Sequence, residues 1–216
     1  KTWEAGGGKG VESVVSEPNQ PSYRSELQKV LAANPDVIVT GSYLADTTII
    51  LREWFQTGHA VAWAIPGWAV PPELIPAIRP AAAEGIMSVD AISNEDDPAF
   101  KAFDAAYQKA MSKPGQGNVY AAECWDMVNC LALAIEAAGG SVDANTLKTK
   151  IREVANPDGQ KVGSFAEGKA ALKKVKINYE GASSALDFDA TGDVKPTFGA
   201  WTVEGGKLVQ KYKFQA

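Results

Sequence analysis

Most of the expected architecture follows from one short stretch of the sequence: Asn34-Pro35-Asp36-Val37-Ile38-Val39-Thr40-Gly41-Ser42-Tyr43. Residues 36–40 form an apolar run that is too short for a helix, so we predict a buried parallel strand there. Pro35 disfavours helical geometry in the residue before it, so the preceding helix must end at that point. The turn after the strand leads into a further predicted helix, residues 45–57, which Gly58 ends. Helix, strand and helix in so few residues are typical of an α/β fold.

Strand and helix signals also alternate on either side of this stretch. Apolar positions at helical spacing predict a helix over residues 23–33. Short apolar runs predict strands at residues 11–15, 59–65 and 85–91, with proline-punctuated helical turns between the last two. This repetition with short connections indicates an α/β fold with doubly wound parallel sheets.

Helices dominate the chain after residue 93, and a β-hairpin ends it. The strands of the hairpin, residues 197–203 and 207–214, are joined by Glu204-Gly205-Gly206. Residues 156–176 give a mixed, loop-like signal. The helices are predicted at residues 99–112, 118–138 and 143–154.

The helix predicted at residues 118–138 lacks a surface to cover it. It is apolar nearly all round, so most of its sides must be buried. Residues 97–194, however, offer almost no strand runs against which it could pack. Either the sheet comes from elsewhere, or part of the chain is absent.

Composition and charge exclude several classes of protein. With 216 residues and 45% apolar side chains, the chain can form a substantial core. A formal net charge of −5 without a Lys/Arg cluster argues against nucleic acid or an anionic membrane as main partner, and no apolar run is long enough to span a membrane. His59 is the single histidine, which excludes a histidine-cluster metal site. Cys124 and Cys130 would point to different sides of one helix, so we expect two buried free thiols.

Several segments, taken in order along the chain, carry a more specific signal. Besides the stretch quoted above, they read Tyr23-Arg24-Ser25-Glu26-Leu27-Gln28-Lys29-Val30, Ile50-Leu51-Arg52-Glu53, Ala83-Glu84-Gly85-Ile86, Ala122-Glu123-Cys124-Trp125-Asp126-Met127-Val128, Tyr179-Glu180-Gly181-Ala182-Ser183-Ser184 and Asp187-Phe188-Asp189-Ala190-Thr191-Gly192-Asp193. The ordered set resembles the periplasmic solute-binding proteins of ABC transporters, in particular the type I, branched-chain amino acid (Leu/Ile/Val-binding-like) family. The resemblance covers nearly the whole chain but only the C-terminal part of the family's sequence.

The resemblance implies a two-lobed type I architecture, in which the chain crosses three times between two α/β lobes. Residues 1–90 would then be the major part of the second lobe, and residues 91–196 a mostly helical returning segment of the first. The hairpin, residues 197–216, would return to the second lobe. The N-terminal part of the first lobe has no counterpart here, so we expect a missing N-terminal polypeptide to supply the sheet beneath the helix at residues 118–138.

The resemblance also implies a function. The expected protein is extracytoplasmic, captures a small molecule between its lobes and delivers it to an ABC permease. The solute would be an amino acid or a related small carboxylate, amide or aromatic metabolite, bound without catalysis, cofactor or metal. A start at Lys1 without a leader is compatible with a processed periplasmic chain and equally with a cut one.

Two alternatives to a transport protein remain open. One is a ligand-binding domain of the same build in a receptor or sensor, which a fused membrane segment would indicate. The other is a small α/β enzyme. The sequence shows no nucleophile–base pair for that chemistry, and residues 6–10 do not have the spacing of a phosphate-binding loop.

The family's ligand positions map onto aromatic and polar residues of this sequence. Tyr43 matches a cleft-lining tyrosine, and Ser42 shares its turn; a tyrosine on a surface turn is the alternative. Tyr120 matches an aromatic position that borders the ligand from the other lobe, although a core tyrosine would give the same pattern.

The loop Pro66-Gly67-Trp68 departs from the family's pattern. Amino-acid-binding members present an acidic residue there that pairs with the ammonium group of the ligand, and Gly67 occupies the equivalent position. Trp68 offers an aromatic face for stacking or a cation–π contact of about 0.5–2 kcal/mol, unless it is only a loop residue. An α-amino acid would need Asp46, Glu73 or a first-lobe residue to supply the missing charge. Otherwise an aromatic acid or an amide is the better match.

Overall fold

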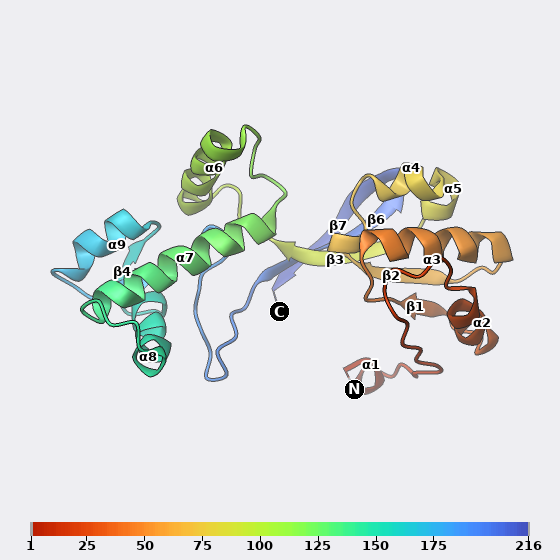
Figure 1. Ribbon diagram of the computed structural model, residues 1–216, viewed down its shortest axis with the longest axis horizontal. Helices are drawn as coiled ribbons and strands as arrows, with labels where there is room; N and C mark the ends of the chain where they lie inside the picture. The colour runs from red at the N-terminus through yellow and green to blue at the C-terminus, as the bar shows by residue number, and fades with distance from the viewer. Residues whose placement is uncertain (1, 216) are drawn as a thin grey trace. The chain divides into compact units, whose positions relative to one another are not determined.

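The chain divides into two units in the computed structural model, which describes residues 2–215 (Figure 1). Unit 1 comprises residues 2–90 and 199–213. Unit 2 comprises residues 91–198 and 214–215. The mixed α/β class predicted from the sequence is confirmed, because parallel strands alternate with helices in the first ninety residues.

The sheet of unit 1 has five strands in the order β1-β2-β3-β6-β7 (Figure 1). Its first three strands are parallel: Ile38 pairs with Trp63, and Ile65 pairs with Ser88. Two backbone hydrogen bonds lead from these strands to the hairpin: the Val203 N–H donates to the Ile86 oxygen, and the Gly85 N–H donates to the Val203 oxygen. The strands are β1 (Val37–Val39), β2 (Ala62–Pro66), β3 (Met87–Ile92), β6 (Thr197–Glu204) and β7 (Lys207–Gln215).

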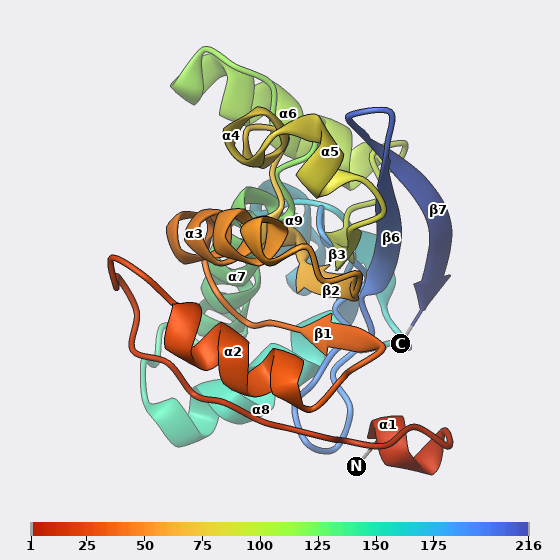
Figure 2. The same ribbon diagram turned by 90° about the vertical axis from the view of Figure 1, so that its right-hand side faces the viewer.

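Helices cover one side of this sheet, as Figure 2 shows for α2, α3, α4 and α5. The core between them and the strands includes Ile38, Trp63 and Leu51, each at most 9% exposed. The side chains that alternate with these along the strands point the other way. The helices of unit 1 are α1 (Thr2–Ala5), α2 (Arg24–Ala32), α3 (Leu44–Thr57), the 3-10 turn η1 (Gly67–Ala69), α4 (Leu74–Ile78) and α5 (Pro80–Ala83).

The opposite face of the sheet is apolar and open. Val39 is 77% exposed, Met87 39% and Val89 41%, although strands of parallel sheets are usually covered on both faces. We call these three residues the open sheet face.

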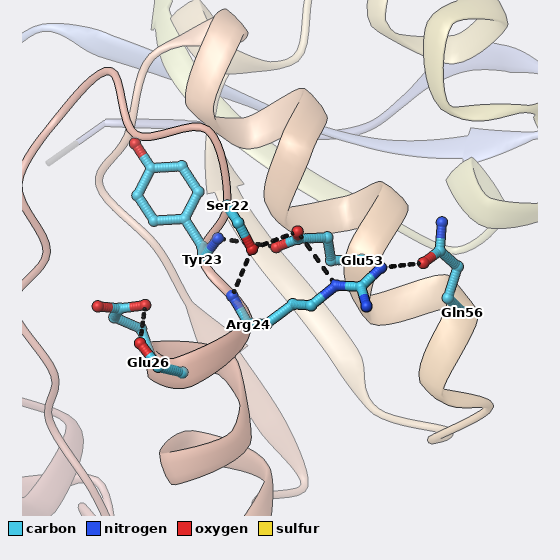
Figure 3. Close-up of polar contacts among 7 residues, drawn as sticks. Ser22, Tyr23, Arg24, Glu26, Glu53 and Gln56 are labelled. Carbon is cyan, nitrogen blue, oxygen red and sulfur yellow. Dashed lines mark hydrogen bonds and ion pairs between the residues drawn. The ribbon is translucent and has the colours of Figure 1, made fainter.

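A polar cluster at the surface of unit 1 attaches α2 to α3 (Figure 3). The Glu53 carboxylate of α3 accepts hydrogen bonds from the Ser22 hydroxyl (2.6 Å) and the backbone N–H of Tyr23 (2.8 Å). The Glu53 carboxylate also pairs with Arg24 of α2, and the Arg24 guanidinium donates to the side chain of Gln56, which lies on α3 like Glu53. The carboxylate therefore satisfies polar groups that begin α2, where a helix has unpaired N–H groups.

Turns predicted from glycine have the expected geometry. Gly58 ends α3 with φ 72°, a conformation that side chains with a Cβ disfavour. Gly205 and Gly206 both have positive φ (58° and 77°), as a two-residue type I′ hairpin turn requires. The Glu84 carboxylate accepts from the backbone N–H of Gly205.

Unit 2 is mainly helical, and each of its described helices begins after a polar N-cap residue of a type that helix N-termini prefer. The side chains of Asp97, Asn118, Asp143 and Ser164 each accept from a backbone N–H in the following turn. The elements are α6 (Pro98–Met111), α7 (Val119–Ala137), α8 (Ala144–Ala155), β4 (Gln160–Val162), α9 (Phe165–Leu172) and β5 (Ile177–Tyr179), with β4 parallel to β5.

One face of α7 is uncovered, in agreement with its all-round apolar sequence. α7 packs against α8 and α9 and buries Cys130, Leu133 and Ala134. On its outer side Met127 is 64% exposed, Val128 66% and Leu131 40%. We call these last three residues the open α7 face. Among residues 2–215, α7 and the other helices are not long and apolar enough to cross a membrane.

Three expectations about local structure are wrong. Residues 11–15 form no strand: Val15 is 92% exposed, and no backbone hydrogen bond recorded for residues 2–215 gives this segment the ladder partner that a strand needs. Residues 156–176 are not mainly loop, since they contain β4 and α9, which are short and give a weak periodic signal. Cys124 is exposed rather than buried, while Cys130 is buried; both are free thiols.

Candidate functional site

Four of the predicted ligand residues lie at one edge of the unit 1 sheet. Because β1, β2 and β3 are parallel, their carboxyl ends meet at the same edge, where α/β folds bind their ligands. Ser42 and Tyr43 follow β1, and Gly67 and Trp68 follow β2. The structure therefore brings these four residues together, and we call this place the carboxyl edge.

A hydrogen bond joins the two loops of the carboxyl edge. The indole Nε1–H of Trp68 donates to the backbone oxygen of Ser42 at 3.2 Å. The 3-10 turn that carries Trp68 closes when the Val70 N–H donates to the Gly67 oxygen at 3.0 Å. The indole is thus held in place while 47% of the residue stays exposed, which gives a fixed aromatic surface at the edge.

The Ser42 hydroxyl belongs to a short chain of hydroxyl groups. It lies 2.6 Å from the Thr47 hydroxyl and 3.3 Å from that of Thr40. Thr47 is fully buried, which anchors the chain in unit 1. Each hydroxyl can donate one hydrogen and accept others, so this chain adapts to a donor or an acceptor at Ser42.

Tyr43 stands at the start of α3. Its backbone is extended (φ −99°, ψ 167°), and its backbone carbonyl oxygen accepts from the Thr47 N–H at 2.9 Å. The residue is 73% exposed, so its ring covers none of the core of unit 1. Its role as a ligand residue stays a prediction.

A carboxylate lies against Gly67, on the neighbouring strand. An ideal Cβ built on Gly67 would stand 2.5 Å from the Cβ of Asp90, near the end of β3, and would also meet its carboxylate oxygen. Any side chain at position 67 would therefore force the Asp90 side chain to move. Our sequence reasoning missed Asp90, although its place at the end of a predicted strand was a usable signal.

The sequence also offered Asp46 and Glu73 as possible partners for the ammonium group of an amino acid. Asp46 is 7% exposed and accepts from the Tyr23 hydroxyl (2.6 Å) and the Asn19 N–H (3.0 Å), so it holds the N-terminal loop. Burial, followed by the hydrogen bond to Asp46, raises the pKa of Tyr23. Glu73 is exposed at the N-cap of α4.

Tyr120 lies in unit 2, in the first turn of α7. It is 43% exposed, so it is not a core tyrosine of that unit. Whether it contacts a ligand stays a prediction.

Unit 2 also contains a buried carboxylate that sequence reasoning missed. Asp126 is 1% exposed and accepts from the Tyr179 hydroxyl (3.0 Å), the Ala182 N–H (2.7 Å), and the N–H and hydroxyl of Ser183 (2.7 and 2.6 Å). Burial raises the pKa of Asp126 against the lowering effect of these bonds, and burial followed by its charge raises that of the Cys130 thiol to about 12. Because Tyr179, Ala182 and Ser183 all donate to it, Asp126 joins α7 to the segment of residues 179–183 and acts as a structural group.

Comparison with known proteins agrees with this geometry. A model of the periplasmic binding protein family matches residues 1–204. The chain belongs to this family. No curated protein matches the chain in a search of such proteins.

Members of the family with known structures share the fold. A leucine-binding protein from Thermotoga maritima has a TM-score of 0.67 at 22% identity, over 94% of this chain and 51% of that one. An ABC transporter solute-binding protein from Rhodopseudomonas palustris, solved with p-hydroxybenzoic acid, has a TM-score of 0.69 at 21% identity, over 100% and 55%. A branched-chain amino acid binding protein from Streptococcus pneumoniae, solved with isoleucine, has a TM-score of 0.59 at 17% identity, over 93% and 50%. This periplasmic binding protein thus spans about half the length of its structural neighbours.

Proposed function

We propose that this family member is an extracytoplasmic solute-binding protein that captures a small solute and delivers it to an ABC permease, without catalysis. The observation that carries the proposal is the bond from Trp68 Nε1 to the Ser42 oxygen, because it fixes an exposed aromatic surface where parallel strands end. The family match supports the same reading. A periplasmic or other extracytoplasmic location follows from this role.

The proposed solute is a small carboxylate with an apolar or aromatic body. Ser42 lies two residues before α3 begins at Leu44, and hydroxyl groups together with helix-start N–H groups favour a carboxylate. Trp68 and Tyr43 supply flat apolar surface. The neighbours solved with p-hydroxybenzoic acid and with isoleucine bind ligands of this class. On unit 2, Tyr120 stays a proposed ligand residue.

We further propose that the protein includes an N-terminal polypeptide beyond these residues, which completes the first lobe. In this proposal residues 1–90 and 197–216 belong to the second lobe and residues 91–196 to the first. Support comes from two uncovered apolar surfaces, the open sheet face and the open α7 face, and from the half-length match to the structural neighbours.

A thermal-shift screen tests the function. The full-length protein is screened against amino acids, aromatic acids and amides, and each stabilising solute is re-isolated afterwards. We expect stabilisation by a small carboxylate that is recovered unchanged, and weaker binding by Tyr43→Ala with the melting temperature of the free protein preserved. Conversion of the solute would indicate an enzyme instead. A receptor or sensor would bind in the same way but would fail to stimulate uptake in vesicles that contain its permease.

A further inference from the structure

We propose that Thr47 sets the direction of the hydroxyl chain at the carboxyl edge and thereby makes Ser42 a hydrogen-bond donor towards the solute. Thr47 is then a positioning residue, because it contacts Ser42 rather than the solute. Its effect is to favour a carboxylate over the neutral amide of the same acid. This inference rests on the proposed function and deepens it, since it names the group that sets the polarity of the site.

The hydroxyl of Thr47 is the buried end of this chain. Thr47 is 0% exposed, and the Ser42 hydroxyl, at 2.6 Å, is the one hydrogen-bond partner recorded for its hydroxyl within residues 2–215. The next residue makes the bond that is common for a threonine in a helix: the Thr48 hydroxyl donates to the backbone oxygen of Leu44 at 2.6 Å. The Thr47 hydroxyl makes no such bond within the described chain, so Ser42 is the acceptor for its hydrogen.

The two directions of the chain therefore differ in free energy. If Thr47 donates to Ser42, the hydrogen of the buried hydroxyl is paired. In the opposite direction Ser42 would donate, and the Thr47 hydrogen would be buried without an acceptor, which is the costly case for a polar group. A chain of hydroxyl groups can adapt to either direction, but the buried end of this one is satisfied in only one of them.

This direction leaves the Ser42 hydroxyl with a hydrogen that it can give to a solute. Its other neighbour, the Thr40 hydroxyl, lies at 3.3 Å, which is longer than an ordinary bond between hydroxyl groups and is easily exchanged. Ser42 itself is only partly buried. No side chain caps the start of α3, so the first N–H groups of that helix are further donors at this edge.

A site made of donors distinguishes a carboxylate from its amide. Both oxygens of a carboxylate accept, whereas an amide has one acceptor and an NH₂ group that donates. In either orientation of the amide, its NH₂ group would meet a donor of the site and stay unpaired. A site that leaves polar groups unpaired rejects the analogue concerned.

Matched pairs of solutes test the inference. Isothermal titration calorimetry on the full-length protein compares benzoate with benzamide and L-leucine with L-leucinamide. Thr47→Val keeps the shape of the side chain but removes the hydroxyl, so that Ser42 can turn and accept from an NH₂ group. We expect this variant to lower the ratio of carboxylate to amide affinity roughly fivefold to fiftyfold. Thr47→Ser keeps the hydroxyl and should keep the wild-type ratio.

Further variants separate this role from a general effect on packing. Thr48→Val removes the neighbouring hydroxyl, which bonds to the backbone of α3, and should leave the ratio unchanged. Thr47→Ala removes the same hydroxyl as Thr47→Val and should lower the ratio in the same way. In a Ser42→Ala background, Thr47→Val should have no effect on the ratio, because Thr47 acts through Ser42. Thermal melts of each variant identify any loss of fold.

The outcomes separate this inference from the function on which it rests. Binding of the carboxylates by Thr47→Val or Thr47→Ala with the wild-type ratio contradicts the role of Thr47 and upholds the proposed function. Equal binding of carboxylate and amide by the wild-type protein does the same, and so does a ratio that falls as far in Thr48→Val as in Thr47→Val. No binding of any of the four solutes at millimolar concentration, in the wild-type protein or the variants, contradicts both.

Discussion

At the scale of single residues, several carboxylates of this chain hold the fold together. Asp46, Asp126 and Glu53 are each surrounded by donors of the chain itself. Asp90, which also has a partner within the chain, lies beside Gly67, a residue without a side chain.

The buried carboxylate of unit 2 leads to a prediction about stability. Asp126→Ala leaves the Tyr179 hydroxyl and the N–H groups of Ala182 and Ser183 buried without an acceptor, and should lower the free energy of unfolding by about 2–4 kcal/mol. Urea unfolding measures the change. The matched control, Asp187→Ala, removes an exposed carboxylate and should have little effect. Equal losses for the two variants would contradict the structural role.

Asp189 leads to a prediction about pH. Hydrogen bonds from the Thr191 hydroxyl, and then from backbone N–H groups of the same turn, lower its pKa to about 2. Because the pKa is lower in the folded state, the stabilisation is present above the unfolded pKa, near 4, and is lost as the pH falls through about 2. NMR titration should find this carboxyl ionised at pH 3, and Asp189→Asn should flatten that part of the stability profile. A titration midpoint near 4 would show that the turn has no such effect.

At the scale of elements, α2 depends on a contact with α3 as well as on its own sequence. Glu53→Gln keeps the shape of the side chain but weakens its bonds to Ser22 and Tyr23, and should cost about 1–2 kcal/mol. Hydrogen exchange should then accelerate in α2 more than in α4. Glu26→Gln is the control, because the Glu26 carboxylate accepts from the hydroxyl of neighbouring Ser25 within α2 and makes no recorded bond to α3. Uniform acceleration of both helices would contradict this anchoring.

Most elements of the fold could be predicted because their signals are local. Gly58 and the Gly205–Gly206 turn need only positive φ, and α6 needs only its Asp97 cap and a following proline. The failures need non-local information. Residues 11–15 have strand composition but no pairing edge, and α9 contains a glycine within eight residues.

The candidate site could be predicted only in part for the same reason. Tyr43 and Trp68 follow recognisable strands, so their place at the carboxyl edge was foreseeable. Asp90 could not be linked to Gly67 from the sequence, since their contact depends on the register of β2 against β3. Asp126 looked like one position of an apolar helix until its donors, more than fifty residues away, were located.

At the scale of the whole molecule, the open sheet face and the open α7 face predict a covering polypeptide. The three methionines make this testable by hydroxyl-radical footprinting, which compares the full-length protein with the 216-residue chain. Met87 and Met127, which lie on the two faces, should become protected in the longer protein. Met111, 54% exposed on α6, should react equally in both and serves as the control. Equal reactivity of all three methionines would contradict the missing segment.

We propose that the carboxyl edge of unit 1 binds a small carboxylate solute, and calorimetric titration of Trp68 variants is the sharpest test of this binding site. With the solute found in the thermal-shift screen, Trp68→Ala should weaken binding by about tenfold to a hundredfold. Trp68→Phe, which keeps an aromatic surface but loses the bond to Ser42, should fall between Trp68→Ala and the wild-type protein. Wild-type affinity in both variants, with unchanged thermal stability, would show that the solute binds elsewhere.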